Sequence, residues 1–207
     1  MDYITLNVLH VCQVLILATS GYRELTNHVD ERKKTFRVAD TGLFVACGTP
    51  ENEKFRALRR DAKRKGSFVI PERVHEELVG GPEEFEPAQG VAAAVERAME
   101  DGWVETYGGI DYTNPKVSEA MDVTRRYIAG QTNRPEHEIE MADAALAGVA
   151  VQILEENERV ELVELYTTDK PAGEGTSRAA KAVGHGSKVE FVYAFDYIAE
   201  LMEGYSP

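Results

Sequence analysis

Four acidic residues lie where an apolar run of the sequence ends or a new one begins, and carboxylates in such places can do chemistry. Asp40 follows the run "FRVA", and Asp169 follows "VELVELYTT". Glu77 lies in "ERVHEELV" after the run "SFVI", and Asp143 heads the stretch "ADAALAGVAV". Carboxylates crowded together raise one another's pKa values unless a divalent cation neutralises them. If the four residues meet, they predict a site for a hard cation such as Mg²⁺ or Mn²⁺.

Each acid also has a plainer explanation that involves no chemistry. Asp40 can cap the turn that follows it, and Asp143 can stabilise the start of a helix. Asp169 can form an Asx turn, and Glu77 can lie in solvent. Taken singly, these structural roles are the better interpretation, but four acids in this order favour a common site.

The elements that must position these acids alternate between strand and helix from Phe36 onward. Short β-type runs are expected at 36–39, 67–70, 103–107, 160–168 and 188–194. Helical patterns are expected at 50–66, 72–79, 88–101, 114–130 and 138–157, with a short helix at the end. The glycine-rich stretch 172–186 is expected to be a mobile loop.

This alternation predicts an α/β fold with three layers, α/β/α, around a parallel sheet of about five strands with helices on both faces. Ligands of such sheets bind at the carboxyl ends of the strands. Asp40 and Asp169 follow strands directly, so we expect them to meet at that edge. We expect residues 36–207 to form one domain and residues 1–35 to be an extension of unknown role.

The chain is strongly acidic, with 36 Asp and Glu against 23 Lys and Arg and a net charge of -13. Acids spread along the chain are typical of a solvated acidic surface, as in cytosolic proteins of salt-loving archaea. Such a charge normally disfavours nucleic acid. At molar salt, however, the screening length falls to about 3 Å, so local contacts decide binding.

The apolar segment 3–21 is the one stretch that resembles a signal peptide or a membrane span. Asn7, His10 and Gln13 interrupt it, and Asp2 precedes it in place of a basic cluster. We therefore expect a cytoplasmic protein with no membrane partner. Cys12 and Cys47 lack metal-binding spacing and are expected to be reduced, buried thiols.

At "RVADTGLFV", "VIPERVHEEL", "MADAALAGVAV" and "LYTTDK" the sequence resembles the PIN-domain family of metal-dependent nucleases. The resemblance implies that Asp40, Glu77, Asp143 and Asp169 are the catalytic, metal-binding acids, with Glu76 as the alternative to Glu77. It implies Mg²⁺ or Mn²⁺ as cofactor and hydrolysis of RNA as the reaction. Hydroxyl groups that orient the acids would come from Thr41, Thr167 and Thr168.

Several functions are compatible with this resemblance. One is the toxin half of a VapBC-like pair, which implies an antitoxin protein as partner and a homodimer; another is an enzyme of RNA maturation or decay. A third is a catalytically inactive PIN-like module that binds RNA or protein. A haloacid-dehalogenase-type enzyme would need an aspartate where Gly42 stands, and no glycine-rich nucleotide-binding motif follows any strand.

RNA also needs a cationic surface, and the helix expected at 50–66 carries most of the clustered positive charge. Arg59, Arg60, Lys63 and Arg64 are predicted to bind the RNA backbone, although a solvated helix face is an equal alternative. Aromatic residues do not alternate with these cations, so base stacking is not predicted there. The segment 81–114 carries no recognisable motif.

Overall fold

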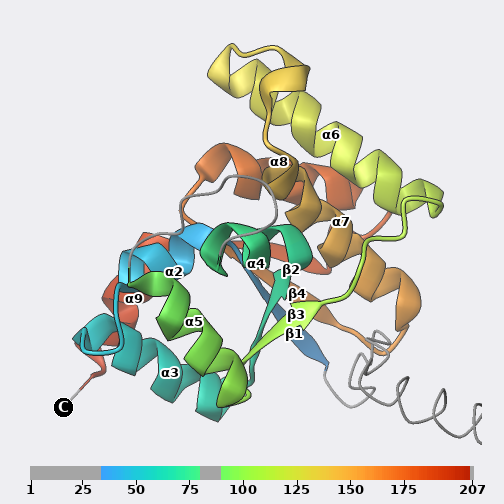
Figure 1. Cartoon of the computed structure of the whole chain (residues 1–207). Coiled ribbons are helices and arrows are strands. Elements are labelled where there is room, and N and C mark those ends of the chain that lie inside the picture. The colour runs from blue at the N-terminus through green and yellow to red at the C-terminus, as the bar shows by residue number, and fades with distance from the viewer. Residues whose placement is uncertain (1–33, 80–89, 206–207) are drawn as a thin grey trace, which may run out of the picture.

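The structure, a computed structural model, describes residues 34–79 and 90–205 (Figure 1). Its strands are β1 (Thr35–Ala39), β2 (Phe68–Pro71), β3 (Val104–Tyr107), β4 (Leu162–Thr167) and β5 (Val189–Tyr193). Its helices are α2 (Thr41–Cys47), α3 (Glu53–Lys65), α4 (Glu72–Val79), α5 (Val91–Glu100), α6 (Pro115–Thr132), α7 (Met141–Glu156), α8 (Lys170–Ala182) and α9 (Ala194–Glu203), with a 3₁₀ turn, η2, at Glu136–Glu138.

The five strands form one parallel sheet in the order β3-β2-β1-β4-β5, which confirms the predicted fold class. The strands are short and apolar because both faces of the sheet are covered. The chain builds the sheet outward from β1 in one direction, then returns to β4 on the other side of β1. The strand order therefore reverses between β1 and β4, and in open α/β sheets the ligand site lies at this switch point.

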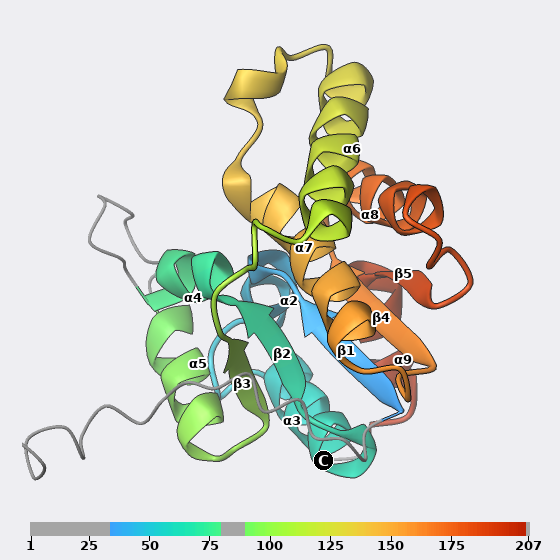
Figure 2. The same ribbon diagram turned by 90° about the vertical axis from the view of Figure 1, so that its right-hand side faces the viewer.

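Helices cover both faces of the sheet, as predicted (Figures 1 and 2). On one face α7 packs across β1, β2 and β4, while α8 packs against β4 and β5 and α6 lies on the outer side of α7 and α8. The other face carries α2, α3, α5 and α9. Helix α4 contacts α2, α5 and α7 at the carboxyl ends of the strands.

Most of the glycine-rich stretch is a helix, so the prediction of a loop at 172–186 was wrong over 172–182, while residues 183–186 lie in the turn that follows. Helix α8 spans Lys170–Ala182, and its glycines lie where neighbouring elements come close. A Cβ atom on Gly173 would stand 2.2 Å from the Phe191 ring of β5. A Cβ on Gly175 would lie 3.1 Å from Tyr127 of α6. The glycines therefore permit tight packing of α8 between β5 and α6, although glycine is a poor helix former.

A buried ion pair joins three elements on the face of the sheet that α3 and α9 cover. Arg37 of β1 is 3% exposed, and its Nη2 donates to Asp61 Oδ2 of α3 at 2.9 Å. Tyr197 of α9 donates its hydroxyl to the same carboxylate oxygen at 2.6 Å. The guanidinium lies 4.0 Å from the centre of the Phe68 ring. Burial of this charge is tolerated because the pair is hydrogen-bonded and stacked.

Several sequence-based predictions concern residues outside the described ranges. These include the apolar segment 3–21, Cys12 and most of the proposed extension 1–35, whose last residue, Thr35, is the first residue of β1. Cys47 is a buried free thiol. Within residues 34–79 and 90–205, no helix is long and apolar enough to cross a membrane.

Candidate active site

Two predicted acids meet at the switch point through one threonine. Asp40 follows β1, and its backbone N–H donates to the carbonyl of Tyr166 on β4 at 3.0 Å. Thr167, the last residue of β4, donates its hydroxyl to Asp40 Oδ2 at 2.8 Å and accepts the Asp169 N–H at 3.0 Å. Thr167 is fully buried, so this bridge is shielded from water and fixes both strand ends.

The third acid, Glu77, reaches the same place from α4. Its Oε2 accepts the Thr41 hydroxyl at 2.8 Å, at the first residue of α2. Burial raises the pKa of Glu77, and the charges of Asp40 and Glu140 raise it further. The neighbouring Glu76 instead accepts a hydrogen bond from Arg73 at 2.9 Å. Of the two adjacent glutamates, Glu77 therefore faces Asp40.

The fourth acid, Asp143, lies in the first turn of α7 and has a strongly raised pKa. Burial, which is the largest cause, and the charges of Asp40, Asp169, Glu140 and Glu77 together raise its pKa to about 7. Asp143 therefore experiences the field of every other predicted acid. We call Asp40, Glu77, Asp143 and Asp169 the acid cluster.

Glu140 is an additional acid that sequence reasoning missed. It is the N-cap residue of α7 and is exposed, but its charge acts on both Glu77 and Asp143. Its position three residues before Asp143 was the available signal, because residues three apart lie on the same side of a helix.

Asp40 is the acid most enclosed by protein. Burial raises its pKa, although the Thr167 hydroxyl and the amide N–H groups of Thr41 and Gly42 favour the charged form. The charge of Asp169 raises the pKa again. The folded chain therefore holds a carboxylate here at an electrostatic cost that its own hydrogen bonds do not offset.

Three helix N-termini point at the acid cluster and explain how the fold tolerates it. Asp40 is the N-cap residue of α2, Asp143 lies in the first turn of α7, and Asp169 caps α8 by accepting the Ala172 N–H at 2.9 Å. The positive end of a helix dipole stabilises a nearby carboxylate by about 0.3–1 kcal/mol. The capping role of Asp169 therefore coexists with a clustered arrangement, whereas the Asp40 side chain makes no cap hydrogen bond.

The acid cluster suits a divalent cation in its chemistry, without forming a closed cage. Among the described residues, no three His, Cys, Asp or Glu side chains converge on one ion position. Mg²⁺ keeps several of its waters and is usually bound through one or two carboxylates. An open arrangement, in which the acids lie near one another without all contacting one position, is compatible with such binding. Burial, together with the charges of neighbouring acids, raises the pKa values of Asp40, Glu77 and Asp143, and a bound cation would favour their charged forms again.

The three predicted hydroxyl residues have different surroundings. Thr41 and Thr167 hydrogen-bond to acids, at Glu77 and Asp40 respectively. Thr168 packs against the first turn of α2: a Cβ atom placed on Gly42 would stand 2.1 Å from the Thr168 hydroxyl oxygen. Sequence reasoning treated Gly42 as part of a turn and missed this close approach.

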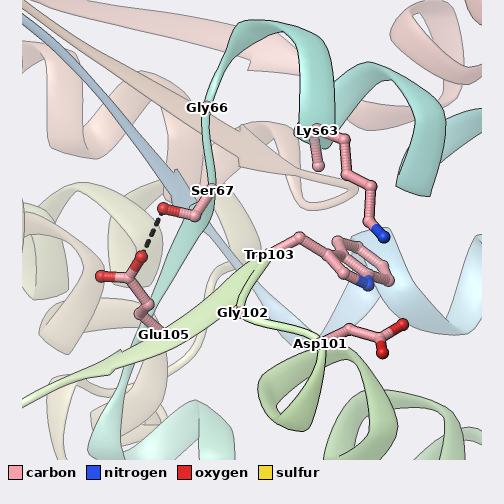
Figure 3. A pocket seen from close by; sticks show the side chains of 8 residues that line it. Lys63, Gly66, Ser67, Asp101, Gly102, Trp103 and Glu105 are labelled. Atoms are coloured by element: carbon pink, nitrogen blue, oxygen red, sulfur yellow. Dashed lines mark hydrogen bonds between the residues drawn. The ribbon is translucent and has the colours of Figure 1, made fainter.

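The predicted RNA-binding residues lie on α3 and do not meet the acid cluster. Lys63 borders a pocket of about 460 Å³ with Trp103 and Asp101, at the amino ends of β2 and β3 (Figure 3). The acids lie beyond the carboxyl ends, at the opposite edge of the sheet.

The other three cations of this set contact nearby protein groups. Arg59 pairs with Asp101 at 2.6 Å, and Arg64 pairs with Asp61 at 3.2 Å. Arg60 lies 4.6 Å from the centre of the Tyr205 ring. A role of these residues in RNA binding stays a prediction, and it would concern RNA that extends well away from the acids.

A five-stranded parallel sheet of this order, with carboxylates from β1, α4, α7 and the β4–α8 junction at its switch point, defines a domain of the PIN type. Residues 33–206 match the family model described as the Halobacterial PIN domain, and the chain therefore belongs to this family. PIN domains are often metal-dependent nucleases. Comparisons with curated proteins and with solved structures found no match.

Proposed function

We propose that this protein is a metal-dependent endoribonuclease that hydrolyses RNA phosphodiester bonds at the acid cluster. The observation that carries the proposal is that four separate elements place four acids near the switch point of the sheet, close enough for the charges of the other three to act on Asp143. Burial and the charges of the neighbouring acids raise the pKa of Asp143 to about 7, and a bound cation would favour its charged form. Membership of a family whose members are often metal-dependent nucleases supports the same conclusion.

The chain's own residues would hold and orient the reacting groups. Asp40, Asp143 and Asp169 offer carboxylate oxygens for Mg²⁺ or Mn²⁺, and Glu77 offers a fourth from α4. When bound, such an ion makes a water molecule more acidic and neutralises charge that develops on the phosphate.

Orientation of these carboxylates comes from hydroxyl and amide groups of the fold. Thr167 holds Asp40 at one oxygen, and the N-cap bond to Ala172 holds Asp169 at Oδ1. Thr41 holds Glu77 at Oε2. Each acid so held therefore keeps a second carboxylate oxygen that could face an ion or its water.

Cleavage of mixed structured RNAs at high KCl tests the proposal, with Mg²⁺, with Mn²⁺ and with a chelator. The expected result is metal-dependent cutting that Asp40→Asn abolishes while the fold stays intact, because the substitution removes one of several repelling charges. Asp122→Asn is the matched control, since Asp122 is exposed on α6 and outside the acid cluster. Cutting by Asp40→Asn at the wild-type rate would contradict the proposed role of this acid.

A second function is favoured by one observation, which is that no three acids within the described residues converge on one ion position. A PIN-like module that binds RNA or a protein without cleaving it would need no such convergence. Folded wild-type protein that cuts no RNA under any of these metals would favour this alternative. A toxin role, with an antitoxin partner and a homodimer, stays a prediction, as do RNA maturation and decay.

A further inference from the structure

The pocket that α4, α7 and the β3–α6 connection enclose lies next to the acid cluster and has no part in it. It measures about 450 Å³, within the range of about 300–1,000 Å³ typical of small-ligand sites. Its wall includes Arg73 and Glu76 of α4, Met141 of α7, and Tyr107 and Tyr112. Figure 2 shows the β3–α6 connection running between α4 and α7, which is the arrangement that forms this pocket.

Large apolar groups of this pocket face solvent. Tyr112 is 61% exposed and Met141 is 46% exposed. Within the described chain, the Tyr112 side chain makes no hydrogen bond or ring contact. An aromatic ring in this state is available to stack on another planar group.

The backbone that carries Tyr112 is nevertheless firmly held. Its carbonyl accepts the Ser118 hydroxyl at 2.7 Å, and the preceding Asp111 donates its N–H to Gln152 Oε1 at 2.9 Å. Gln152 is a buried residue of α7, and its amide group donates to Glu156, which also accepts the Tyr107 hydroxyl. Tyr112 is thus presented from a preorganised segment, which reduces the entropy lost when a ligand binds.

The charges around this pocket disfavour a phosphate. Glu72 and Glu76 line it against a single cation, Arg73, which already pairs with Glu76 at 2.9 Å. A neutral planar group with N–H donors matches two carboxylates better than an anion does. The same carboxylates would repel the two carbonyl groups of a uracil ring, and would accept from an exocyclic amino group.

The pocket and the acid cluster are neighbouring but separate sites. Arg73 lines the pocket, and its charge also acts on Glu77, where it partly opposes the rise in pKa that burial causes. Met141 and Asp143 share the first turn of α7 but lie on different sides of the helix, whose diameter is about 10 Å. A base in the pocket would therefore belong to a nucleotide that flanks the phosphate at the acids.

We propose that this pocket binds one unpaired nucleobase of the RNA substrate, stacked on Tyr112, and that it favours bases with an exocyclic amino group over uracil. The inference rests on the proposed ribonuclease function, because that function brings single-stranded RNA to the neighbouring acids. It assigns a role to the connection "TYGGIDYTNPK", and it adds the aromatic contact that the basic helix α3 lacks.

Fluorescence anisotropy tests the proposal with labelled eight-nucleotide RNAs in the Asp40→Asn background, so that no cleavage interferes. The measurements use Mg²⁺ and molar KCl, with oligocytidylate and oligouridylate as ligands matched in ring size. Tyr112→Ala is expected to weaken binding of oligocytidylate roughly five- to 150-fold, the range for loss of one base–aromatic stack. Tyr112→Phe keeps the ring and should bind like the parent protein.

Tyr205→Ala is the matched control, because Tyr205 contacts Arg60 of α3 and lies outside the pocket. A thermal melt of each variant checks the fold, and truncation of a side chain as exposed as Tyr112 should leave the midpoint unchanged. Equal binding by Tyr112→Ala and the parent protein would overturn the pocket. Equal affinity for the two RNAs would overturn the base preference.

The outcomes also separate this inference from the proposed function. Tyr112-dependent RNA binding by a wild-type protein that cuts no RNA would support the pocket and overturn the nuclease. Metal-dependent cleavage that Tyr112→Ala leaves unchanged in rate and base preference would support the nuclease and overturn the pocket. Self-association that depends on Tyr112, without a change in RNA binding, would assign this face to a second copy of the chain and overturn the proposal.

Discussion

Thr167 is the residue on which the orientation of the strand-end acids depends. One hydroxyl group serves as donor to Asp40 and as acceptor for the Asp169 N–H, in a fully buried position. Removal of the hydroxyl would leave the half-buried Asp169 N–H without this partner and free Asp40 to rotate. A residue outside the acid cluster therefore controls the geometry within it.

We predict that Thr167→Val lowers the cleavage rate about 10- to 100-fold, the usual effect of removing a group that orients a metal ligand. The unpaired N–H should also cost about 1–3 kcal/mol of unfolding free energy. Single-turnover cleavage and chemical denaturation measure the two effects. Thr176→Val is the matched control, since Thr176 is equally buried but its hydroxyl has no partner within the described chain, and it should be neutral or stabilising.

At the scale of elements, helix α2 can approach the end of β4 because residue 42 is glycine. The Thr168 side chain occupies the space that a Cβ atom at this position would need. Asp40 and Thr41 belong to the same turn, so a displacement of α2 would move both of them relative to Thr167. This contact links packing between elements to the position of the acids.

We predict that Gly42→Ala destabilises the protein by about 1–3 kcal/mol, as overpacking does, and lowers activity by displacing Asp40. Gly130→Ala is the matched control, because Gly130 lies within α6 and a Cβ there meets no atom within 4 Å. That variant should gain about 0.5–1 kcal/mol from its better helix propensity. Denaturation midpoints compare the two variants. Equal stability of both would show that the Thr168 side chain can move aside without loss of unfolding free energy.

The ion pair of Arg37 and Asp61 gives the packing of β1, α3 and α9 a pH dependence. Burial alone would raise the pKa of Asp61, but the Tyr197 hydrogen bond and the charges of Arg37 and Lys65 outweigh it and lower the pKa. A carboxyl whose pKa is lower in the folded state contributes stability above its unfolded pKa of about 3.9. That contribution is lost as the pH falls through the folded value.

We therefore predict that unfolding free energy falls as the pH drops below about 4, and that Asp61→Asn lacks this part of the pH dependence. At neutral pH the variant should lose about 3–5 kcal/mol, because Arg37 stays buried without its nearer carboxylate partner and keeps only Glu164 at 3.7 Å. Denaturant titrations across the pH range measure both effects. If the unfolding free energy of Asp61→Asn fell with pH below about 4 as steeply as that of the wild type, other carboxyl groups would cause the fall.

At the scale of the whole molecule, a net charge of -13 repels itself and is screened by salt. The screening length is about 10 Å at 0.1 M salt and about 3 Å at 1 M. Repulsion between surface carboxylates, and between these carboxylates and RNA, should therefore weaken as KCl rises. High KCl would therefore both stabilise the fold and allow an anionic substrate such as RNA to bind.

We predict a higher melting temperature in molar KCl than at 0.1 M, by about 2–4 °C for each kcal/mol of repulsion removed. RNA binding should also not weaken with added KCl as steeply as it does in proteins that rely on basic surfaces. Thermal melts and binding titrations over the same salt series measure the two trends. A melting temperature that is constant or falls with KCl would contradict the view that self-repulsion limits stability.

The sequence alone determined the fold class and the acids worth testing. Alternating strand and helix patterns allow few arrangements, because parallel strands need crossovers of one hand, and so the carboxyl ends share one edge. Asp40 and Asp169 directly follow strands, and this placement was sufficient to predict that they meet. The expected bounds of the strands and of α4 and α5 agree with the structure to within three residues, because apolar runs and breaking residues mark them, and a short final helix was expected without bounds.

Only the tertiary structure decided which neighbouring side chains enter the site. Successive helix residues point about 100° apart. The packing of α4 therefore decides that Glu77 accepts from Thr41, next to Asp40, while Glu76 accepts from Arg73. The glycines of α8 favoured a loop in the sequence, and only the structure shows that they allow β5 to approach the helix closely. The structure also decided that Lys63 of α3 lies at the amino ends of the strands, away from the acids, and that Tyr112 lies beside α4. Such contacts join residues that are distant in sequence, so they depend on the whole fold.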